Sequence, residues 1–274
     1  MTDFQTVKVQ GLPRLAVDHA GSGELVICLH GIGGNRRNWH DNFAALAPHF
    51  HIAAWDARGY GDSDDYDGPL DFDDFAHDLA RVLDHFGARR AHVMGLSMGG
   101  RIAMEFARLY PDRLLSLTFC ATNSGFDMFT DAEHAAFVAS RKAPLLAGLT
   151  PRDIAWDVAR SLISPESSVA ALDQLVDSMA RLHADSYIKA IEALVALPPC
   201  RSLGEITVPV HVICGERDPL TTPEQSRALA ADIPHARLTF VPKAGHLVNL
   251  ERSDDFNRAA LDFLLAIRAP TPGI

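Results

Sequence analysis

The sequence predicts an α/β protein with a doubly wound, mostly parallel sheet into which a helical cap is inserted. Strand-like and helical segments alternate up to about residue 123 and again from residue 208, which is the pattern of a parallel sheet. Between these two regions, four helical segments follow one another without a strong strand pattern. We therefore predict a core made of residues 1–124 and 204–274 and a helical cap made of residues 125–203.

The composition narrows the partners that the chain is expected to bind. Its 274 residues are 47% hydrophobic, which is enough for a large buried core. The formal net charge of -10 gives no electrostatic reason to bind nucleic acid or an anionic membrane, so we expect neither. The start of the chain lacks a basic segment followed by an apolar run, and no apolar run is long enough to cross a bilayer. We expect a cytoplasmic protein.

The cysteines are expected to be reduced thiols. Three of the four, Cys28, Cys120 and Cys214, lie in apolar strand-like runs, where cysteine behaves as a small hydrophobic residue. The spacing of the four, Cys200 included, fits no metal-binding pattern. The sequence therefore predicts no metal site.

The first half of the chain is expected to begin with a hairpin, because a turn at Gly11-Leu12-Pro13 separates two strand-like stretches, residues 4–10 and 12–18. Continuous apolar runs, typical of strands covered on both faces, then alternate with segments that have one apolar face. The expected strands are residues 25–29, 51–55, 91–94 and 114–121, and the expected helices begin near Asn38 and span residues 72–86 and 101–110.

The second half opens with the helices of the predicted cap and then returns to alternation. The expected cap helices are residues 131–140, 151–163, 167–183 and 186–197. After them we expect strands at residues 208–214 and 236–241 and helices at residues 223–233 and 254–267.

A Gly-x-Ser-x-Gly motif, Gly95 to Gly99, lies between an expected strand and an expected helix. Such a motif is typical of a nucleophile elbow, a tight turn at which glycines avoid a clash between strand and helix. Ser97 Oγ would then stand at a helix N-terminus, which favours developing negative charge. The alternative is a glycine-rich turn whose serine only caps the helix.

A nucleophilic serine needs a base, and the base needs a group that orients it. Asp218 follows the expected strand that ends near Cys214, and His246 follows the one that ends near Val241. Loops at the carboxyl ends of parallel strands meet at one edge of the sheet, so we expect Ser97, Asp218 and His246 to lie together. Glu216 and Asp127 are the alternatives for the acid.

The tetrahedral oxyanion of such a reaction needs two hydrogen-bond donors. We expect the backbone N–H of Met98, next to the serine, and that of Ile32, in the glycine-rich loop after the strand at residues 25–29. That loop lacks the Lys-Ser/Thr of a phosphate loop and the spacing of a dinucleotide site. We therefore expect no cofactor.

Taken together, these motifs make the chain resemble the α/β-hydrolase fold superfamily over nearly its whole length, in particular the branch of 3-oxoadipate enol-lactonases and small carboxylesterases. The resemblance implies Ser97 as nucleophile, His246 as base, Asp218 as its orienting acid, and Ile32 and Met98 as oxyanion donors. It is carried by His30-Gly31 with Trp39 downstream, Asp56-x-Arg58-Gly59-x-Gly61-x-Ser63, the elbow, Asp218 and Ala244-Gly245-His246.

Three positions separate the chain from other branches of the superfamily. Ser97, where haloalkane dehalogenases and epoxide hydrolases carry aspartate, argues against both. Leu247 stands where C–C bond hydrolases of aromatic ring cleavage tend to carry tryptophan, which disfavours that activity. Tyr60 replaces a histidine of many relatives, and we expect its role to be structural.

The cap is expected to set specificity, through apolar side chains and through cations that could bind a substrate carboxylate. For each cation taken singly, solvation at the surface is the expected role. The apolar candidates are Phe126, Met128, Phe129, Phe137, Trp156 and Met179, and the cationic ones are Arg141, Lys142, Arg152 and Arg160.

The sequence thus predicts a cofactor-independent serine hydrolase, a carboxylic ester hydrolase that cleaves a small ester or lactone through an acyl-enzyme on Ser97. The alternatives are a C–C bond hydrolase of ring-cleavage products, an amide or deformylating hydrolase, and a slow-turnover ligand receptor on the same fold. The expected partner is a small-molecule substrate. The oligomeric state stays open, with a homodimer as one alternative.

Overall fold

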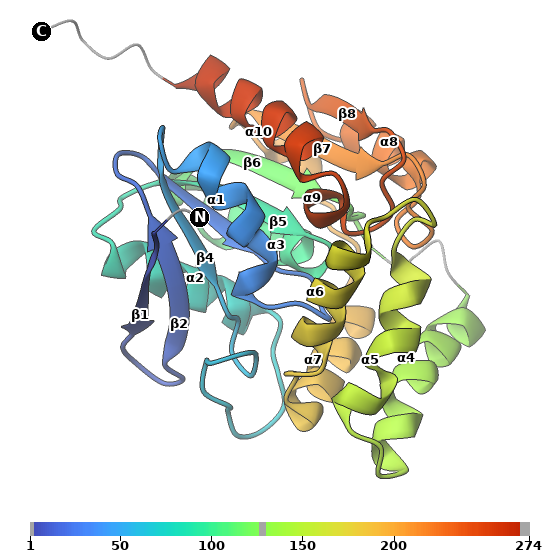
Figure 1. Ribbon diagram of the computed structural model, residues 1–274. Coiled ribbons are helices and arrows are strands. Elements are labelled where there is room, and N and C mark those ends of the chain that lie inside the picture. The colour runs from blue at the N-terminus through green and yellow to red at the C-terminus, as the bar shows by residue number, and fades with distance from the viewer. Residues whose placement is uncertain (1–2, 126–129, 269–274) are drawn as a thin grey trace, which may run out of the picture.

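The computed structural model describes residues 3–125 and 130–268 (Figure 1). Its centre is an eight-stranded sheet with the strand order β1-β2-β4-β3-β5-β6-β7-β8. The neighbouring pairs β1–β2 and β2–β4 are antiparallel, and all other neighbours are parallel. The predicted mostly parallel sheet is confirmed. The strands are β1 (Gln5–Val9), β2 (Leu15–Ala20), β3 (Leu25–Leu29), β4 (His51–Trp55), β5 (Ala91–Leu96), β6 (Leu114–Cys120), β7 (Val210–Gly215) and β8 (Arg237–Val241).

Helices cover both faces of the sheet, because its central strands are apolar on both sides (Figure 1). Helix α1 packs against α10 on one face, where Trp39 meets the ring of Phe256 at 5.9 Å, and α2 packs against α3 on the other. The helices of the core are α1 (His40–Leu46), α2 (Asp73–His85), α3 (Met98–Leu109), α8 (Pro223–Ala231), α9 (Val248–Glu251) and α10 (Ser253–Ile267), with short 3₁₀ turns η1 (Arg36–Trp39), η2 (Pro111–Arg113) and η3 (Leu203–Glu205).

Four further helices lie between β6 and β7, as the pattern of the sequence predicts, and gather at one end of the sheet (Figure 1). We call them the inserted helices: α4 (Asp131–Leu146), α5 (Pro151–Leu162), α6 (Val169–Met179) and α7 (Ala184–Ala196). Within this group α5 packs against α6, and α4 packs against α7. The division of the chain into a core and a cap at residues 125 and 203 stays a prediction.

Most elements lie within a few residues of their expected positions, and two differ. Helix α4 runs to Leu146 instead of ending at Ser140, and it includes Pro144 near its C-terminal end. Proline there removes one backbone hydrogen bond without ending the helix. The short helix α9 was not expected, because four residues are too few to show a helical period.

Buried side chains form a continuous hydrophobic core across both faces of the sheet. The three cysteines of the strand-like runs are buried and unpaired as expected, and burial raises the pKa of Cys28 and Cys120. No helix within residues 3–125 and 130–268 is long and apolar enough to cross a membrane.

Candidate active site

Ser97 lies in a sharp turn between β5 and α3, with backbone angles of φ 54° and ψ -114°. A positive φ is strained for a residue with a side chain. Hydrogen bonds hold the turn, since Ser97 N donates to Cys120 O at 2.8 Å and Thr122 Oγ1 donates to Ser97 O at 2.9 Å. The tight turn that the motif predicts is therefore present.

The glycines on either side of Ser97 are required by close packing. A Cβ on Gly95 would lie 2.2 Å from Gly99 O, and one on Gly99 would lie 2.3 Å from Leu29 O. Because neither backbone oxygen could move aside cheaply, only glycine lets the strand, the turn and the helix approach so closely.

His246 and Asp218, from the loops after β8 and β7, form a buried hydrogen-bonded pair. His246 Nδ1 lies 2.9 Å from Asp218 Oδ2 and 3.1 Å from Oδ1. A carboxylate only accepts, so Nδ1 carries the proton and leaves Nε2 as an acceptor. Burial raises the pKa of Asp218, but its electrostatic interaction with His246 and hydrogen bonds from His246 and Thr221 outweigh burial, so that the pKa lies below its usual value.

Thr221 is a supporting residue that the sequence analysis missed. Its Oγ1 donates to Asp218 Oδ2 at 2.6 Å, and the backbone N–H groups of Leu220 and Thr221 donate to Oδ1 at 2.8 and 2.9 Å. The signal was available, because an aspartate followed by a proline, with a threonine three residues after the aspartate, is typical of a turn closed by the carboxylate. Glu216, the alternative acid, is exposed, and Asp127 lies outside the described residues.

Glu251, also missed, holds the loop that carries His246. Its carboxylate accepts hydrogen bonds from Gly245 N at 2.9 Å and Leu247 N at 3.0 Å, on the two sides of His246. The same carboxylate accepts from Ser164 N at 2.9 Å, in the connection between α5 and α6. The sequence gives no signal for this residue, because two of its partners are backbone N–H groups of the preceding loop and the third, Ser164, lies in a distant segment.

The glycine-rich loop after β3 lies close to Ser97. A Cβ on Gly31 would lie 3.3 Å from Ser97 Cβ, and Ile32 and Met98 line one cavity together with Ser97. Both expected donor residues are thus near the serine.

The loop is held in place by His30, which is buried beside the ring of Tyr60, at 4.8 Å. Because Gly31 O can only accept, His30 Nδ1–H donates to it at 2.8 Å, and Nε2 accepts from Ala57 N at 3.1 Å. Burial lowers the pKa of His30, in keeping with a neutral ring. The structural role expected of Tyr60 agrees with its complete burial.

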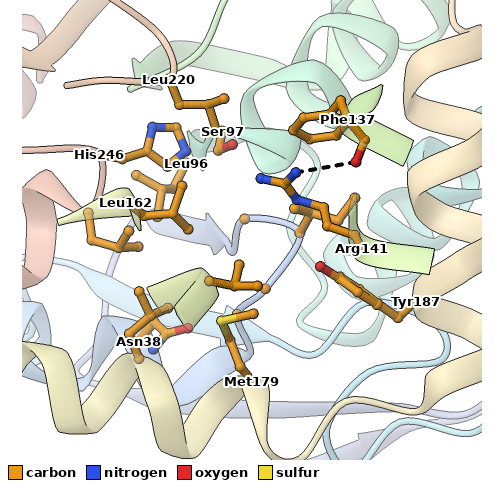
Figure 2. Close-up of a pocket in the computed structure, with 17 residues that line it drawn as sticks. Asn38, Leu96, Ser97, Phe137, Arg141, Leu162, Met179, Tyr187, Leu220 and His246 are labelled. Atoms are coloured by element: carbon orange, nitrogen blue, oxygen red, sulfur yellow. Dashed lines mark hydrogen bonds between the residues drawn. The ribbon is translucent and has the colours of Figure 1, made fainter. Parts of the chain in front are cut away.

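A cavity lies between Ser97 and His246 on one side and the inserted helices on the other (Figure 2). Its wall is mostly apolar, and Arg141 and Tyr187 bring polar groups to it. The apolar residues that the inserted helices contribute to it are Phe137, Val158, Leu162, Leu175 and Met179. A cavity of this kind, apolar with a few polar groups, suits a small organic molecule.

The residues expected to line a pocket divide into two groups. Phe137, Met179 and Arg141 line the cavity, whereas Trp156 is 52% exposed. The surface role expected of Arg141 is therefore wrong, because its helix turns that side chain toward the cavity (Figure 2). The remaining cations have other surroundings: Arg152 and Arg160 are exposed, and Lys142 pairs with Glu192. Phe126, Met128 and Phe129 lie outside the described residues.

Among the residues that the structure describes, metal-binding groups do not gather at the site. Within the part of the chain that the structure describes, no three or more His, Cys, Asp or Glu side chains are arranged to hold a metal ion. The groups at the Ser97 end of the cavity are a serine, a histidine oriented by a carboxylate, and backbone near both.

The chain belongs to the alpha/beta hydrolase fold family, whose model matches residues 24–253. It is 29% identical to 3-oxoadipate enol-lactonase 2 of Acinetobacter baylyi, over 89% of this chain and 91% of that protein. It is 31% identical to a Pseudomonas savastanoi protein provisionally named carbamate hydrolase RutD, over 88% of this chain and 94% of that protein.

A solved structure agrees with this assignment. A thermophilic esterase from Thermogutta terrifontis, with malate bound, has a TM-score of 0.88 and 25% identity, over 97% of this chain and 100% of that chain. The family that the sequence motifs resemble is therefore confirmed, and the relatives support a hydrolase.

Proposed function

We propose that the protein is a cofactor-independent serine hydrolase that cleaves a small ester or lactone, with Ser97 as nucleophile. The observation that carries the proposal is the buried pair of His246 Nδ1 and Asp218 Oδ2, 2.9 Å apart, on the same side of the cavity as Ser97. This pair leaves His246 Nε2 as a base directed away from the carboxylate. A serine held at a positive φ beside such a base is arranged for nucleophilic attack.

In the first half of the proposed reaction, Ser97 Oγ attacks the acyl carbon and its proton passes to His246 Nε2. The carbonyl oxygen becomes an oxyanion, for which the N–H groups of Ile32 and Met98 are the donors. His246 then gives the proton to the leaving alkoxide, and the acyl group stays on Ser97. In the second half, water attacks this ester with His246 again as the base, which releases the acid and restores Ser97.

Asp218 has a positioning role in this scheme. It keeps the proton on Nδ1 and stabilises the imidazolium that forms during each proton transfer. Its low pKa ensures that the carboxylate is charged at neutral pH. In the ground state Thr221 and two backbone N–H groups hold it, so the imidazolium needs little rearrangement of its surroundings.

Relatives support this reaction class, since an enol-lactonase and an esterase are among the proteins that the chain is similar to. Because a provisionally named carbamate hydrolase is also among these relatives, carbamates are included among the substrates to be assayed. A C–C bond substrate and a ligand that is bound without turnover also stay as outcomes.

The test is to assay the purified protein on short esters, an enol-lactone, carbamates and a ring-cleavage keto acid. Ser97→Ala should lower hydrolysis by roughly 10⁶-fold, as for other catalytic serines. Ser161→Ala, at an exposed serine of α5, is the matched control and should keep the full rate. A fluorophosphonate should label Ser97, as mass spectrometry of the peptides would show.

The results separate the alternatives. If only carbamates, or only the keto acid, were turned over, the proposed ester or lactone substrate would be wrong and that compound class would take its place. Hydrolysis that survives in Ser97→Ala would remove Ser97 as nucleophile. No turnover of any substrate, together with tight ligand binding, would leave a ligand receptor.

A further inference from the structure

Arg141 brings a positive charge into an apolar cavity. It comes from α4, lines the cavity, and directs its guanidinium toward the side on which Ser97 lies (Figure 2). The other cavity-lining groups contributed by the inserted helices are apolar, except for the phenol of Tyr187. Burial lowers the pKa of Arg141, because the cavity wall removes part of the water that would hydrate the charged guanidinium.

The guanidinium keeps part of its hydrogen-bonding capacity. Its Nη1 donates to Phe137 O at 3.3 Å and to Ser140 Oγ at 3.1 Å, both on its own helix. The guanidinium carbon lies 3.8 Å from the centre of the Phe137 ring, so the planar cation rests against an aromatic face. Within residues 3–125 and 130–268, no carboxylate pairs with Arg141, and neither Nε nor Nη2 has a hydrogen-bond partner.

Arg141 is half-buried, and even partial burial of a cation without a counter-charge costs free energy that a charged ligand would return. The two nitrogens without a partner among the described residues, Nε and Nη2, form the fork that a carboxylate fits with its two oxygens. Tyr187 is 1% exposed and lines the same cavity, and burial raises the pKa of its phenol, which therefore remains a neutral donor. One cation with one phenol suits a single carboxylate better than a more highly charged group.

We propose that Arg141 binds a carboxylate of the substrate, with Tyr187 as a second donor, so that the enzyme acts on acid-bearing esters or lactones. This inference rests on the function proposed above, because it takes Ser97 as the point of cleavage. The acid group lies on the side of the inserted helices, and the bond that is cleaved lies at Ser97. The substrate therefore spans the cavity between these two groups.

The test compares two substrate series of equal length. One series is the monomethyl esters of the linear dicarboxylic acids from malonate to suberate, and the other is their dimethyl esters. The ratio of kcat/KM for the monoester to that for the diester measures the preference for a free carboxylate. We expect the wild-type protein to prefer the monoester, with an optimum chain length set by the separation of Arg141 and Ser97.

Substitutions then assign the preference to residues. Arg141→Gln should lower the ratio on the order of 100-fold, as expected when a buried charge pair loses one partner. Arg141→Lys should keep part of it, because lysine keeps the charge and loses the fork. Tyr187→Phe should lower it by about tenfold or less. Arg160→Gln removes the same charge from an exposed position of α5 and should leave the ratio unchanged.

A ratio that is the same in Arg141→Gln and in the wild type, or a wild-type preference for the diester, would overturn the proposal. A fall in both rates by the same factor would also overturn it, because a merely structural residue does not distinguish the two series.

Binding separates this failure from failure of the proposed function. Calorimetry with the Ser97→Ala protein and the dicarboxylates themselves should show affinity that Arg141→Gln removes, even if no ester is cleaved. Conversely, Ser97-dependent cleavage of neutral esters without any effect of Arg141 would leave the serine hydrolase standing and remove the carboxylate site.

Discussion

Replacing Glu251 with glutamine is expected to lower both the stability of the protein and its rate of hydrolysis. The Glu251 carboxylate is buried, and it accepts hydrogen bonds from backbone N–H groups of Gly245, Leu247 and Ser164 at 2.9, 3.0 and 2.9 Å. Ser167 Oγ also donates to it. Glutamine has nearly the same shape, but only one of its two terminal atoms accepts, and it carries no charge.

The cost follows from the arrangement of the two oxygens. Oε2 receives Gly245 N, Ser164 N and Ser167 Oγ, so the amide oxygen of glutamine is expected there, and its NH₂ group then faces Leu247 N–H. The backbone bonds that remain lose the charge, at about 1 kcal/mol each, and the Leu247 N–H loses its acceptor, at about 1–3 kcal/mol. Together these losses predict a fall of about 3–5 kcal/mol in the free energy of unfolding.

The same change should loosen His246, because the two N–H groups flanking it are both held by Glu251. A displacement of about 1 Å in a catalytic group can reduce the rate by about 10²-fold. We therefore expect kcat/KM to fall by about ten- to a hundredfold, measured on a short ester at a temperature at which the variant is fully folded.

Denaturant unfolding and ester hydrolysis together test the two predicted effects of Glu251→Gln, on stability and on rate. Asp254→Asn, which alters an exposed carboxylate three residues further along the chain, should change the free energy of unfolding by no more than about 0.5 kcal/mol. Equal unfolding midpoints for Glu251→Gln and the wild type would refute the hydrogen-bond reasoning. A destabilised variant with full kcat/KM would refute only the positioning of His246.

Two further predictions concern packing and titration. Gly99→Ala should lower the free energy of unfolding by about 1–3 kcal/mol or more, because its methyl would lie 2.3 Å from Leu29 O. Denaturant unfolding measures this loss, with Gly204→Ala as the control, since the nearest atom to a methyl there is 4.0 Å away. An effect of Gly99→Ala no larger than that of the control would contradict the prediction. Burial lowers the pKa of His211 to about 3, so between pH 6.5 and 3 the unfolded chain binds the extra proton. The free energy of unfolding therefore falls as the pH is lowered through this range, by up to about 1.4 kcal/mol per unit. Between pH 7 and pH 5 the free energy of unfolding of His211→Gln should fall less than that of the wild type. An equal fall in the two proteins would contradict this role of His211.

The parts of the site that could be predicted from the sequence are those with local signals. The glycines beside Ser97 indicate a close approach of backbone segments. The tight turn can therefore be predicted from the motif alone, without information on distant segments. Asp218 and His246 each follow an apolar run, so strand ends alone place them at one edge of a parallel sheet. Topology thus predicts that the two side chains lie near one another, and the structure shows them joined by a hydrogen bond.

The parts that could not be predicted depend on how distant segments pack. Trp156 and Arg141 both lie on inserted helices, and periodicity alone does not say which face of such a helix turns toward the sheet. The structure leaves Trp156 at the surface and brings Arg141 into the cavity, the reverse of what hydrophobicity favours. Glu251 escaped notice for the same reason, because its acceptor role depends on Ser164 and on the His246 loop.

The inserted helices and the loop of His246 are directly connected, and this bears on how substrate choice and bond cleavage relate. His246 N donates to Leu162 O at 3.0 Å, at the end of α5, and Glu251 links the same loop to Ser164. Arg141 lies on α4, whose main packing partner within the group is α7, whereas α5 packs mainly against α6. A change at Arg141 is therefore expected to alter which substrate binds and to leave His246 in place. A change at the end of α5, by contrast, is expected to move the base itself and to slow hydrolysis of every substrate alike.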